Sequence, residues 1–214
     1  MAYTFPEGGK FLFSETFASA KTISGITNGN PAVATSVAHG FVDGNEILLS
    51  SGWEDAGDSV YTVDQQSVDT FDIDGLNTID TRWFNPGGGV GGAQLISNWV
   101  EIPQVLTIAT SGGDPRFTEI NPIARRNGLS IPTGFNATSI TLTLGHDASN
   151  VNYQQMLDVS RSLRKVAFKM ALSGSVSYGY GYLAVSEMPS LNNNQANQVT
   201  ASFSLLGRSI SYAS

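Results

Sequence analysis

The chain contains no cysteine, which excludes disulfide bonds and thiolate metal sites. It has only two histidines, His39 and His146, so little imidazole is available for a zinc site. No apolar run reaches the ~18 residues typical of a membrane-spanning helix. The N-terminus has no basic segment followed by an apolar one, so we expect no secretory signal. These absences favour a protein without a cofactor, a metal site or a membrane span.

Charged residues are also scarce, at 14% of the 214 residues, against roughly 25% in an average globular protein. The net charge of −7 argues against a general nucleic-acid-binding protein, because phosphate contacts require lysine and arginine. The charge is unevenly distributed, since residues 23–95 hold ten acidic residues and one basic residue, Arg82, which gives −9. We therefore expect this segment to form a unit with a different surface from the rest of the chain.

Alternating apolar and polar residues, separated by turn signals, predict a mainly β (α+β) fold. The predicted organisation is an N-terminal arm or first strand at 1–22, an inserted acidic all-β module at 23–95, and a core domain formed by 96–214 together with 1–22. The predicted strands of the module are 32–38, a strand after the Asp43-Gly44 turn, 59–65 and 69–75, and those of the core are 105–110, 139–144, 175–188 and 199–207. Segments rich in glycine and proline at 85–92 and 111–136 are predicted to be loops.

One amphipathic helix is predicted over about 150–172. Its apolar residues recur at steps of three and four, and they are Met156, Val159, Leu163, Val166 and Met170. Ser149 or Asn150 is expected to cap the beginning of this helix, and Gly174 lies just past its end. Four basic residues lie mostly off the apolar stripe, namely Arg161, Arg164, Lys165 and Lys169. They could contact nucleic acid, but a solvated face or ion pairs with acidic residues of a neighbouring subunit are favoured.

Three motifs suggest chemistry only weakly. Gly87, Gly89 and Gly92 match a dinucleotide-binding fingerprint, but no strand precedes them and Pro103 leaves no room for a long helix, so a flexible loop is favoured. Asp72-Ile73-Asp74-Gly75 resembles a calcium loop that lacks its final glutamate, so a solvated strand edge is favoured. His146 lies beside Asp147, but no nucleophile elbow accompanies it. We therefore assign no catalytic, cofactor-binding or metal-binding residues and expect no enzymatic activity.

Aromatic residues offer one further hypothesis. Tyr178, Tyr180 and Tyr182 recur at period two and are expected to share one face of a strand. They could stack on sugars together with Trp53, Trp83 or Trp99, as in a receptor-binding or glycan-binding adhesin with a β-sandwich fold. Packing against a core or a subunit interface is the favoured alternative, because strands commonly carry aromatic residues.

The last third of the chain carries a family resemblance. Residues 160–174 (SRSLRKVAFKMALSG) and 180–208 (YGYLAVSEMPSLNNNQANQVTASFSLLGR) resemble the major tail, or tail tube, proteins of long, non-contractile-tailed bacteriophages of the lambda type. The shared features are the helix region, a strand ending near Ser186-Glu187-Met188-Pro189, an Asn-rich connection, and a final strand running into Leu206-Gly207-Arg208.

This resemblance implies a β-sandwich or half-barrel protomer with a flanking helix. It implies a structural virion protein that assembles in the host cytoplasm into hexameric rings, which stack into a tube that conducts DNA during ejection. The implied partners are further copies of the chain, a tape-measure protein, a tail terminator and tail-tip proteins, and double-stranded DNA passes through without specific binding. The acidic module at 23–95 departs from the minimal pattern, and we expect it to be an outward-projecting insertion or a long lateral extension.

Overall fold

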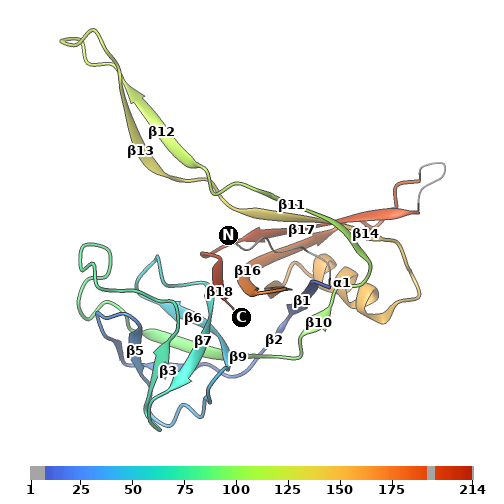
Figure 1. Cartoon of the computed structure of the whole chain (residues 1–214), viewed down its shortest axis with the longest axis horizontal. Helices are drawn as coiled ribbons and strands as arrows, with labels where there is room; N and C mark the ends of the chain where they lie inside the picture. Colours follow the sequence, from blue (N-terminus) through green and yellow to red (C-terminus); the bar gives the residue numbers. More distant parts are fainter. Residues whose placement is uncertain (1–7, 192–195, 214) are drawn as a thin grey trace.

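The computed structural model describes residues 8–191 and 196–213, and within them it shows a mainly β molecule with one α-helix. Two antiparallel sheets lie side by side, and a two-stranded ribbon projects from one of them (Figure 1). This arrangement confirms the predicted mainly β, sandwich-like fold with one flanking helix.

The first sheet contains the predicted C-terminal strands. Its order is β10 (Val100–Glu101), β1 (Lys10–Ser14), β15 (Lys165–Leu172), β16 (Ser175–Val185), β17 (Gln198–Leu205), β14 (Ser139–Gly145) and β11 (Val105–Ser111), and β18 (Ile210–Ala213) also pairs with β16. The strict alternation in β14 and β17 buries every second side chain, as predicted, and exposes the serines and threonines between them wholly or in part.

The second sheet is formed by residues 16–97. Its order is β2 (Thr16–Phe17), β9 (Gly91–Ser97), β6 (Glu46–Ser51), β7 (Ser59–Gln65), β8 (Thr70–Ile73), β5 (Ala32–Thr35) and β4 (Gly25–Ile26), and β3 (Lys21–Ile23) also pairs with β9. The Asp43-Gly44 turn forms as expected, since Gly44 has a φ of 77° and Asp43 Oδ1 accepts a hydrogen bond from Gln65 N.

The helix α1 is shorter than predicted and covers only Val151–Arg161. The prediction of a helix through residue 172 was wrong, because 165–172 form strand β15, paired with β1 on one side and β16 on the other. Val166 and Phe168 point into the core from this strand, while Leu163, which the helical pattern placed on the apolar stripe, is 73% exposed. Strand neighbours on both sides therefore override the helical periodicity of this segment.

The predicted loop at 111–136 contains both strands of a projecting ribbon, so that prediction was also wrong. Strands β12 (Pro115–Ile120) and β13 (Leu129–Phe135) pair with each other and with no other described strand. The ribbon extends the β11–β14 strand pair away from the sheet, as Figure 1 shows.

Three clusters of buried side chains hold the molecule together. The first lies between α1 and the first sheet, and includes Tyr153, Met156, Phe168 and Phe203. The second cluster is the core of the second sheet and includes Trp53, Tyr61 and Phe71. The third cluster lies between the two sheets. The two sheets are therefore packed directly against each other and not merely tethered by the chain. The six residues of the third cluster are Leu48, Val60, Ile96, Ala167, Tyr178 and Tyr180.

Candidate assembly surfaces

The projecting ribbon is the most exposed part of the described chain. Every residue of β12 and all but Gly134 of β13 are exposed. Ile120 lies opposite Leu129, and Thr118 lies opposite Ile131, so three aliphatic side chains share one face. Phe117 pairs with Pro132 on the other face. Apolar side chains therefore face solvent on both sides of a ribbon that has no covering layer.

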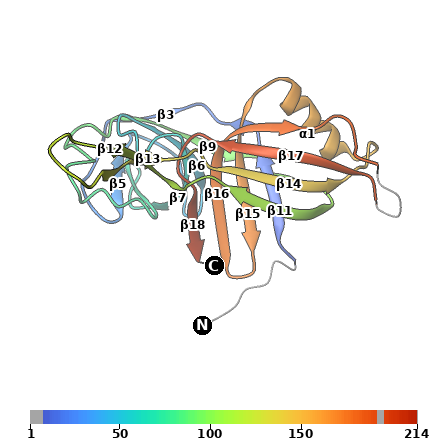
Figure 2. The same cartoon turned by 90° about the horizontal axis from the view of Figure 1, so that it is seen from above.

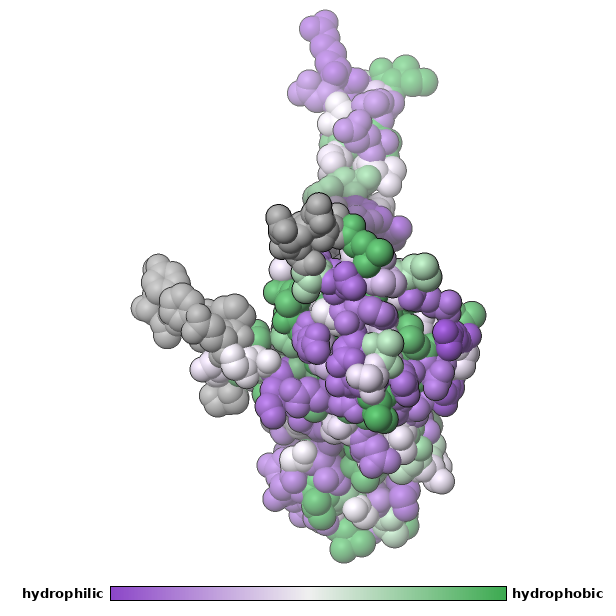
Figure 3. Space-filling model, turned by 90° about the vertical axis from the view of Figure 1, so that its right-hand side faces the viewer, coloured by the Kyte–Doolittle hydropathy of each residue, from purple (hydrophilic) through white to green (hydrophobic). Residues whose placement is uncertain are grey.

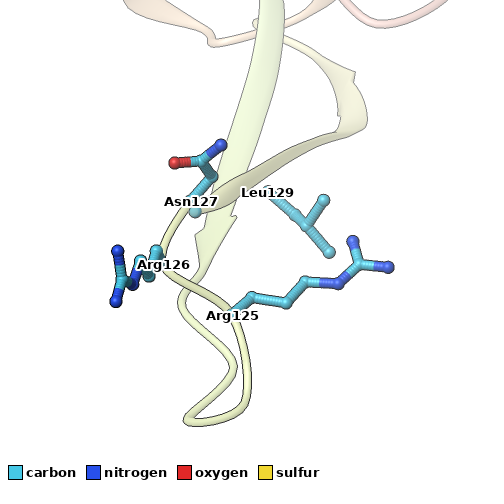
Figure 4. Close-up of a pocket in the computed structure, with 5 residues that line it drawn as sticks. Arg125, Arg126, Asn127 and Leu129 are labelled. Atoms are coloured by element: carbon cyan, nitrogen blue, oxygen red, sulfur yellow. The ribbon is translucent and has the colours of Figure 1, made fainter.

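The end of the ribbon is basic. A shallow pocket there is lined by Arg125, Arg126, Asn127, Gly128 and Leu129. Figure 4 shows Arg125 and Leu129 extending to one side of the turn and Arg126 to the other. In the space-filling view of Figure 3 the ribbon stands clear of the rest of the molecule and shows both hydrophilic and hydrophobic residues.

Strand β11 is a free edge of the first sheet in the described part of the chain. It pairs with β14 on one side only, and most of its residues are exposed. A cleft separates its beginning from the β1–β10 end of the same sheet, where Phe11, Glu101 and Ile102 lie. Every second residue of this seven-residue strand directs its backbone N–H and C=O away from β14, and these groups can pair with another strand.

An ion pair and a tyrosine hydroxyl bonded to it lie at the junction of the two sheets. Glu46 on β6 is 2.5 Å from the ammonium nitrogen of Lys169 on β15, and it accepts a 2.6 Å hydrogen bond from the hydroxyl of Tyr178 on β16. The side chains of Glu46 and Lys169 are 12% and 24% exposed. Burial, followed by the bond to Glu46, raises the pKa of Tyr178 far above its usual range, so this hydroxyl stays protonated.

The C-terminal strand β18, which pairs with β16 of the first sheet, also contacts the second sheet. The Tyr212 hydroxyl donates to the backbone oxygen of Asp74 and accepts from the backbone nitrogen of Thr62, both in the second sheet. Close by, the backbone of Gly207 passes so near the carbonyl oxygen of Asp58 that a side chain there would collide with it.

The histidines have structural surroundings. His39 is buried, with Nε2 bonded to Ser67 O and Nδ1 accepting from Phe41 N. His146 contacts the hydroxyl of Tyr153 at 3.3 Å. Within the described residues, neither imidazole ring makes a hydrogen bond with a serine hydroxyl.

The glycine motif and the calcium-like motif differ from the flexible loop and the solvated strand edge that the sequence favoured. Asp72 and Ile73 belong to β8, which pairs with β5 on one side and β7 on the other, so they do not lie at a sheet edge. Residues 86–89 form a turn, and Gly91 and Gly92 begin strand β9, so no helix follows the glycines. The glycine turn, expected to be a flexible loop, is packed against the protein, because Gly88 and Gly89 lie against the Trp53 ring. In addition, the indole nitrogen of Trp53 donates a hydrogen bond to the backbone oxygen of Asn85. Within the described residues, no group of three or more histidine or acidic side chains could hold a metal ion.

The four basic residues assigned to the helix do not form one basic face. Arg161 pairs with Glu187 and Asp158, Arg164 pairs with Glu15, and Lys169 pairs with Glu46. Lys165 lies near the rings of Tyr180 and Tyr182. Three of the four are therefore neutralised by acidic side chains of the same chain.

The aromatic residues do not form one sugar-binding platform. Tyr178 and Tyr180 share a strand face with Tyr182 as predicted, but they are buried between the two sheets, and Tyr182 is 40% exposed. Trp53 is buried against Phe84, while Trp83 is exposed. The favoured prediction for the Tyr strand, packing in an interior, describes Tyr178 and Tyr180.

Neither the ribbon nor the charged junction was predicted from the sequence. Strand β13 carried a weak signal, since Leu129 and Ile131 alternate with Ser130, but Pro115, Pro122 and Pro132 obscured it. The junction had no local signal, because Glu46 and Lys169 are 123 residues apart.

The described chain is a mainly β protein whose most exposed features are a free strand edge and a projecting ribbon. A family model described as phage tail tube protein, TTP, matches residues 51–214. The chain therefore belongs to the phage tail tube protein family and is a structural component of the virion tail. The match begins inside the acidic segment 23–95, so it covers more of the chain than the residues that carry the resemblance in the sequence. A comparison with curated proteins found no match.

No helix in the described residues combines the length and apolar character that crossing a membrane requires.

Proposed function

We propose that this chain assembles into hexameric rings that stack into the phage tail tube, and that the tube conducts DNA during ejection. Family membership supports a tube-forming role. The proposed partners are further copies of the chain, a tape-measure protein, the tail terminator and tail-tip proteins, with assembly in the host cytoplasm. We propose no catalytic role and no specific DNA binding.

The observation that carries this proposal is the exposed ribbon β12–β13. A two-stranded ribbon is at best marginally stable alone in water. This ribbon exposes Phe117 by 58%, Ile131 by 44% and Phe135 by 71%, and no other element covers it in the described chain. A second copy of the chain that packs against both faces would remove this apolar surface from water. Because the ribbon reaches beyond its own protomer (Figure 1), it is suited to contact a neighbouring copy.

The free edge of β11 supports closure into a ring. Exposed strand edges pair readily with other chains, and closing a sheet into a barrel removes them. We propose that β11 pairs with a strand of the adjacent protomer, so that the first sheet continues around the channel.

The division of the chain remains a proposal as well. We propose that 1–22 and 96–214 form the tube-building domain and that 23–95 form an inserted module on the outside of the tube. The acidic character of the module supports an outward position, because ten carboxylates are most easily hydrated on an outer surface.

Negative-stain electron microscopy at rising protein concentration tests the proposal. We expect hollow rings or tubes for the unmodified chain. Ile131→Asp places a charge on the aliphatic face of the ribbon and is expected to abolish stacking while leaving the circular dichroism spectrum unchanged. Val68→Asp is the matched control, since Val68 is also an exposed apolar residue but lies in the turn that connects β7 and β8 of the second sheet.

Two results would contradict the proposal. One is a strictly monomeric unmodified chain at all concentrations, even with tail-tip proteins present. The other is normal tube formation by Ile131→Asp, which would exclude the ribbon from the contact between copies.

A further inference from the structure

The end of α1 carries an exposed leucine in an unfavourable backbone conformation. Ser162 is the C-cap of the helix, and Leu163, the next residue, has a φ of 52°. Glycine is the usual residue at this position, because a side chain makes the left-handed conformation costly. The Leu163 side chain is also 73% exposed, so it gains little from burial in its own protomer. Neither the backbone nor the packing of the described protomer therefore favours leucine here.

Two further apolar side chains are exposed near this turn. Met188 is 79% exposed and Leu191 is 71% exposed, and both lie in the segment that follows β16. This segment is tied to the last residue of α1, because Arg161 Nε donates a 2.8 Å hydrogen bond to Glu187 Oε1. We call Leu163, Met188 and Leu191 the helix-end patch.

The charges beside the helix-end patch are unbalanced. Asp158 and Glu187 are both exposed, and they share Arg161, at 3.8 and 2.8 Å. Arg164 has an ion pair of its own. Lys165 points to the other side of the sheet, where its ammonium lies near two tyrosine rings. The rim of the patch therefore has one carboxylate more than it has cations.

The end of the projecting ribbon has the complementary composition. Its turn carries Arg125 and Arg126, and neither pairs with an acidic side chain within residues 8–191 and 196–213. Ile123, in the same turn, is fully exposed. An apolar and basic turn matches an apolar patch with an acidic rim, and such charge complementarity favours association and fixes its orientation.

The ribbon and the patch lie at opposite ends of the first sheet. The ribbon continues from the end where Ser111, Ser139 and Ser204 are aligned. The segment of the patch lies at the other end, where Ser190 pairs with Gln198, the first residue of β17. Figure 2 shows α1 at one side of the molecule and β12–β13 at the other. Copies arranged head to tail can therefore bring the ribbon of one to the patch of the next, and such a contact can repeat along a tube.

We infer that the helix-end patch of one copy receives the end of the ribbon of the next copy. The apolar side chains of the ribbon cover Leu163 and Met188. Its arginines face Asp158 and Glu187. This inference rests on the proposed function, in which the ribbon contacts a neighbouring copy. It adds which surface of the neighbour is contacted, and it explains a leucine where glycine would suit the single chain.

Leu163→Gly separates this contact from the stability of the protomer. Glycine adopts the left-handed conformation freely, so we expect the urea midpoint of the variant to equal or exceed that of the unmodified chain. Assembly should nevertheless weaken, because burying a leucine strengthens a contact by about tenfold or more. The concentration at which half of the chain sediments as tubes should therefore rise by about tenfold.

Ala38→Gly is the matched control. Ala38 is also exposed and has a positive φ of 48°, but it lies in the loop between β5 and β6 of the second sheet. We expect this variant to keep or raise the urea midpoint and to assemble at the same concentration as the unmodified chain. An equal loss of assembly in both variants would contradict a specific role of Leu163.

Cross-linking tests which two surfaces meet, because the chain has no cysteine of its own. Chains with Ile123→Cys are mixed with chains that carry Met188→Cys, assembled, and treated with a bis-maleimide cross-linker. We expect dimers that contain one chain of each kind, and only in assembled tubes. Ile123→Cys mixed with Val42→Cys is the control and should give no such dimers, since Val42 is exposed in the second sheet.

The outcomes separate the inference from the proposed function. If tubes form but Leu163→Gly assembles at the same concentration as the unmodified chain, the helix-end patch is not in the contact and the inference is wrong. Tubes in which Ile123→Cys and Met188→Cys do not cross-link would also overturn it, because the ribbon would then bind elsewhere. If the unmodified chain forms no tubes, the proposed function fails and this inference fails with it.

Discussion

Asp74 lies at the turn after β8, close to two other carboxylates. Asp64 and Asp72 are directly opposite each other on β7 and β8, a pairing of like charges that destabilises a sheet. Burial raises the pKa of Asp74 above its usual range. A hydrogen bond from Thr62 partly lowers it, and the negative charges of Asp64 and Asp72 raise it further. The neutral form of Asp74 is therefore favoured by folding.

We predict that Asp74→Asn increases stability at pH 7. A carboxyl group with a raised pKa stabilises the fold fully below its unfolded pKa, and this contribution is lost as the pH rises through the folded pKa. The asparagine variant should therefore be more stable than the unmodified chain at pH 7 and similar to it near pH 4. Urea unfolding at the two pH values measures the difference.

Asp80→Asn is the matched control for this experiment. Hydrogen bonds from Arg82 lower the pKa of Asp80 to about 2, so its charged form is the favoured one. This variant should not gain stability at pH 7. An equal gain in both variants would show that general charge reduction, and not the surroundings of Asp74, is responsible.

At the scale of the element, α1 depends on the residue before its first turn. Asn150 has extended backbone angles, and its side-chain oxygen accepts hydrogen bonds from the backbone nitrogens of Asn152 and Tyr153, at 3.0 and 3.2 Å. The neighbouring Ser149, the other predicted cap, bonds to Asp147 instead. The cap is therefore Asn150.

We predict that Asn150→Ala destabilises the protein by about 1 kcal/mol, because two backbone donors of the first turn lose their acceptor. Thermal unfolding followed by circular dichroism measures the effect. Ser149→Ala should cost clearly less, since Ser149 does not cap the helix. A larger loss in Ser149→Ala than in Asn150→Ala would contradict this assignment.

Two elements show why local pattern was insufficient. Residues 165–172 fit both a helical stripe and a strand, because Val166 and Met170 are four apart while Val166 and Phe168 are two apart. The strand forms because β1 and β16 supply backbone partners on both sides. In β12–β13 the prolines suggested a loop, yet Pro115 and Pro132 are tolerated in a ribbon with free outer edges.

At the scale of the whole molecule, the relation between the two sheets depends on the junction at Glu46. Lys169 Nζ lies 5.6 Å from the ring centroids of both Trp99 and Tyr178, so this ammonium is surrounded by aromatic rings and has Glu46 as its counter-charge. The junction joins β6 of the second sheet to β15 and β16 of the first.

We predict that Glu46→Gln destabilises the protein by about 3 kcal/mol. This is the lower end of the range for breaking a buried ion pair, because the Lys169 side chain is still partly exposed to water. Glutamine retains an acceptor for the Tyr178 hydroxyl, so the loss reports the missing charge. Chemical unfolding at neutral pH measures it.

Glu101→Gln is the control for the junction. Its ion pair with Lys10 is exposed on both sides, and such a pair contributes at most about 1 kcal/mol. Similar losses in the two variants would mean that the junction is no stronger than a surface contact.

Family membership and the mainly β character could be predicted from the sequence, and both are confirmed. The alternating apolar and polar residues of β14 and β17 also indicated a buried and an exposed face for each strand, because successive side chains of a strand point to opposite sides. The boundaries of the 23–95 module and the hexameric ring remain proposals, since the first concerns how the chain divides into domains and the second concerns contacts between copies of the chain.

The sequence by itself determined which side chains of each clear strand face the core, because alternation is a property of neighbouring residues. Only the tertiary structure decided which strands pair and in which register. That register brought Glu46 to Lys169 and made a strand of 165–172. The physical reason is that pairing is fixed by backbone hydrogen bonds and packing between residues far apart in the chain, which no local pattern contains.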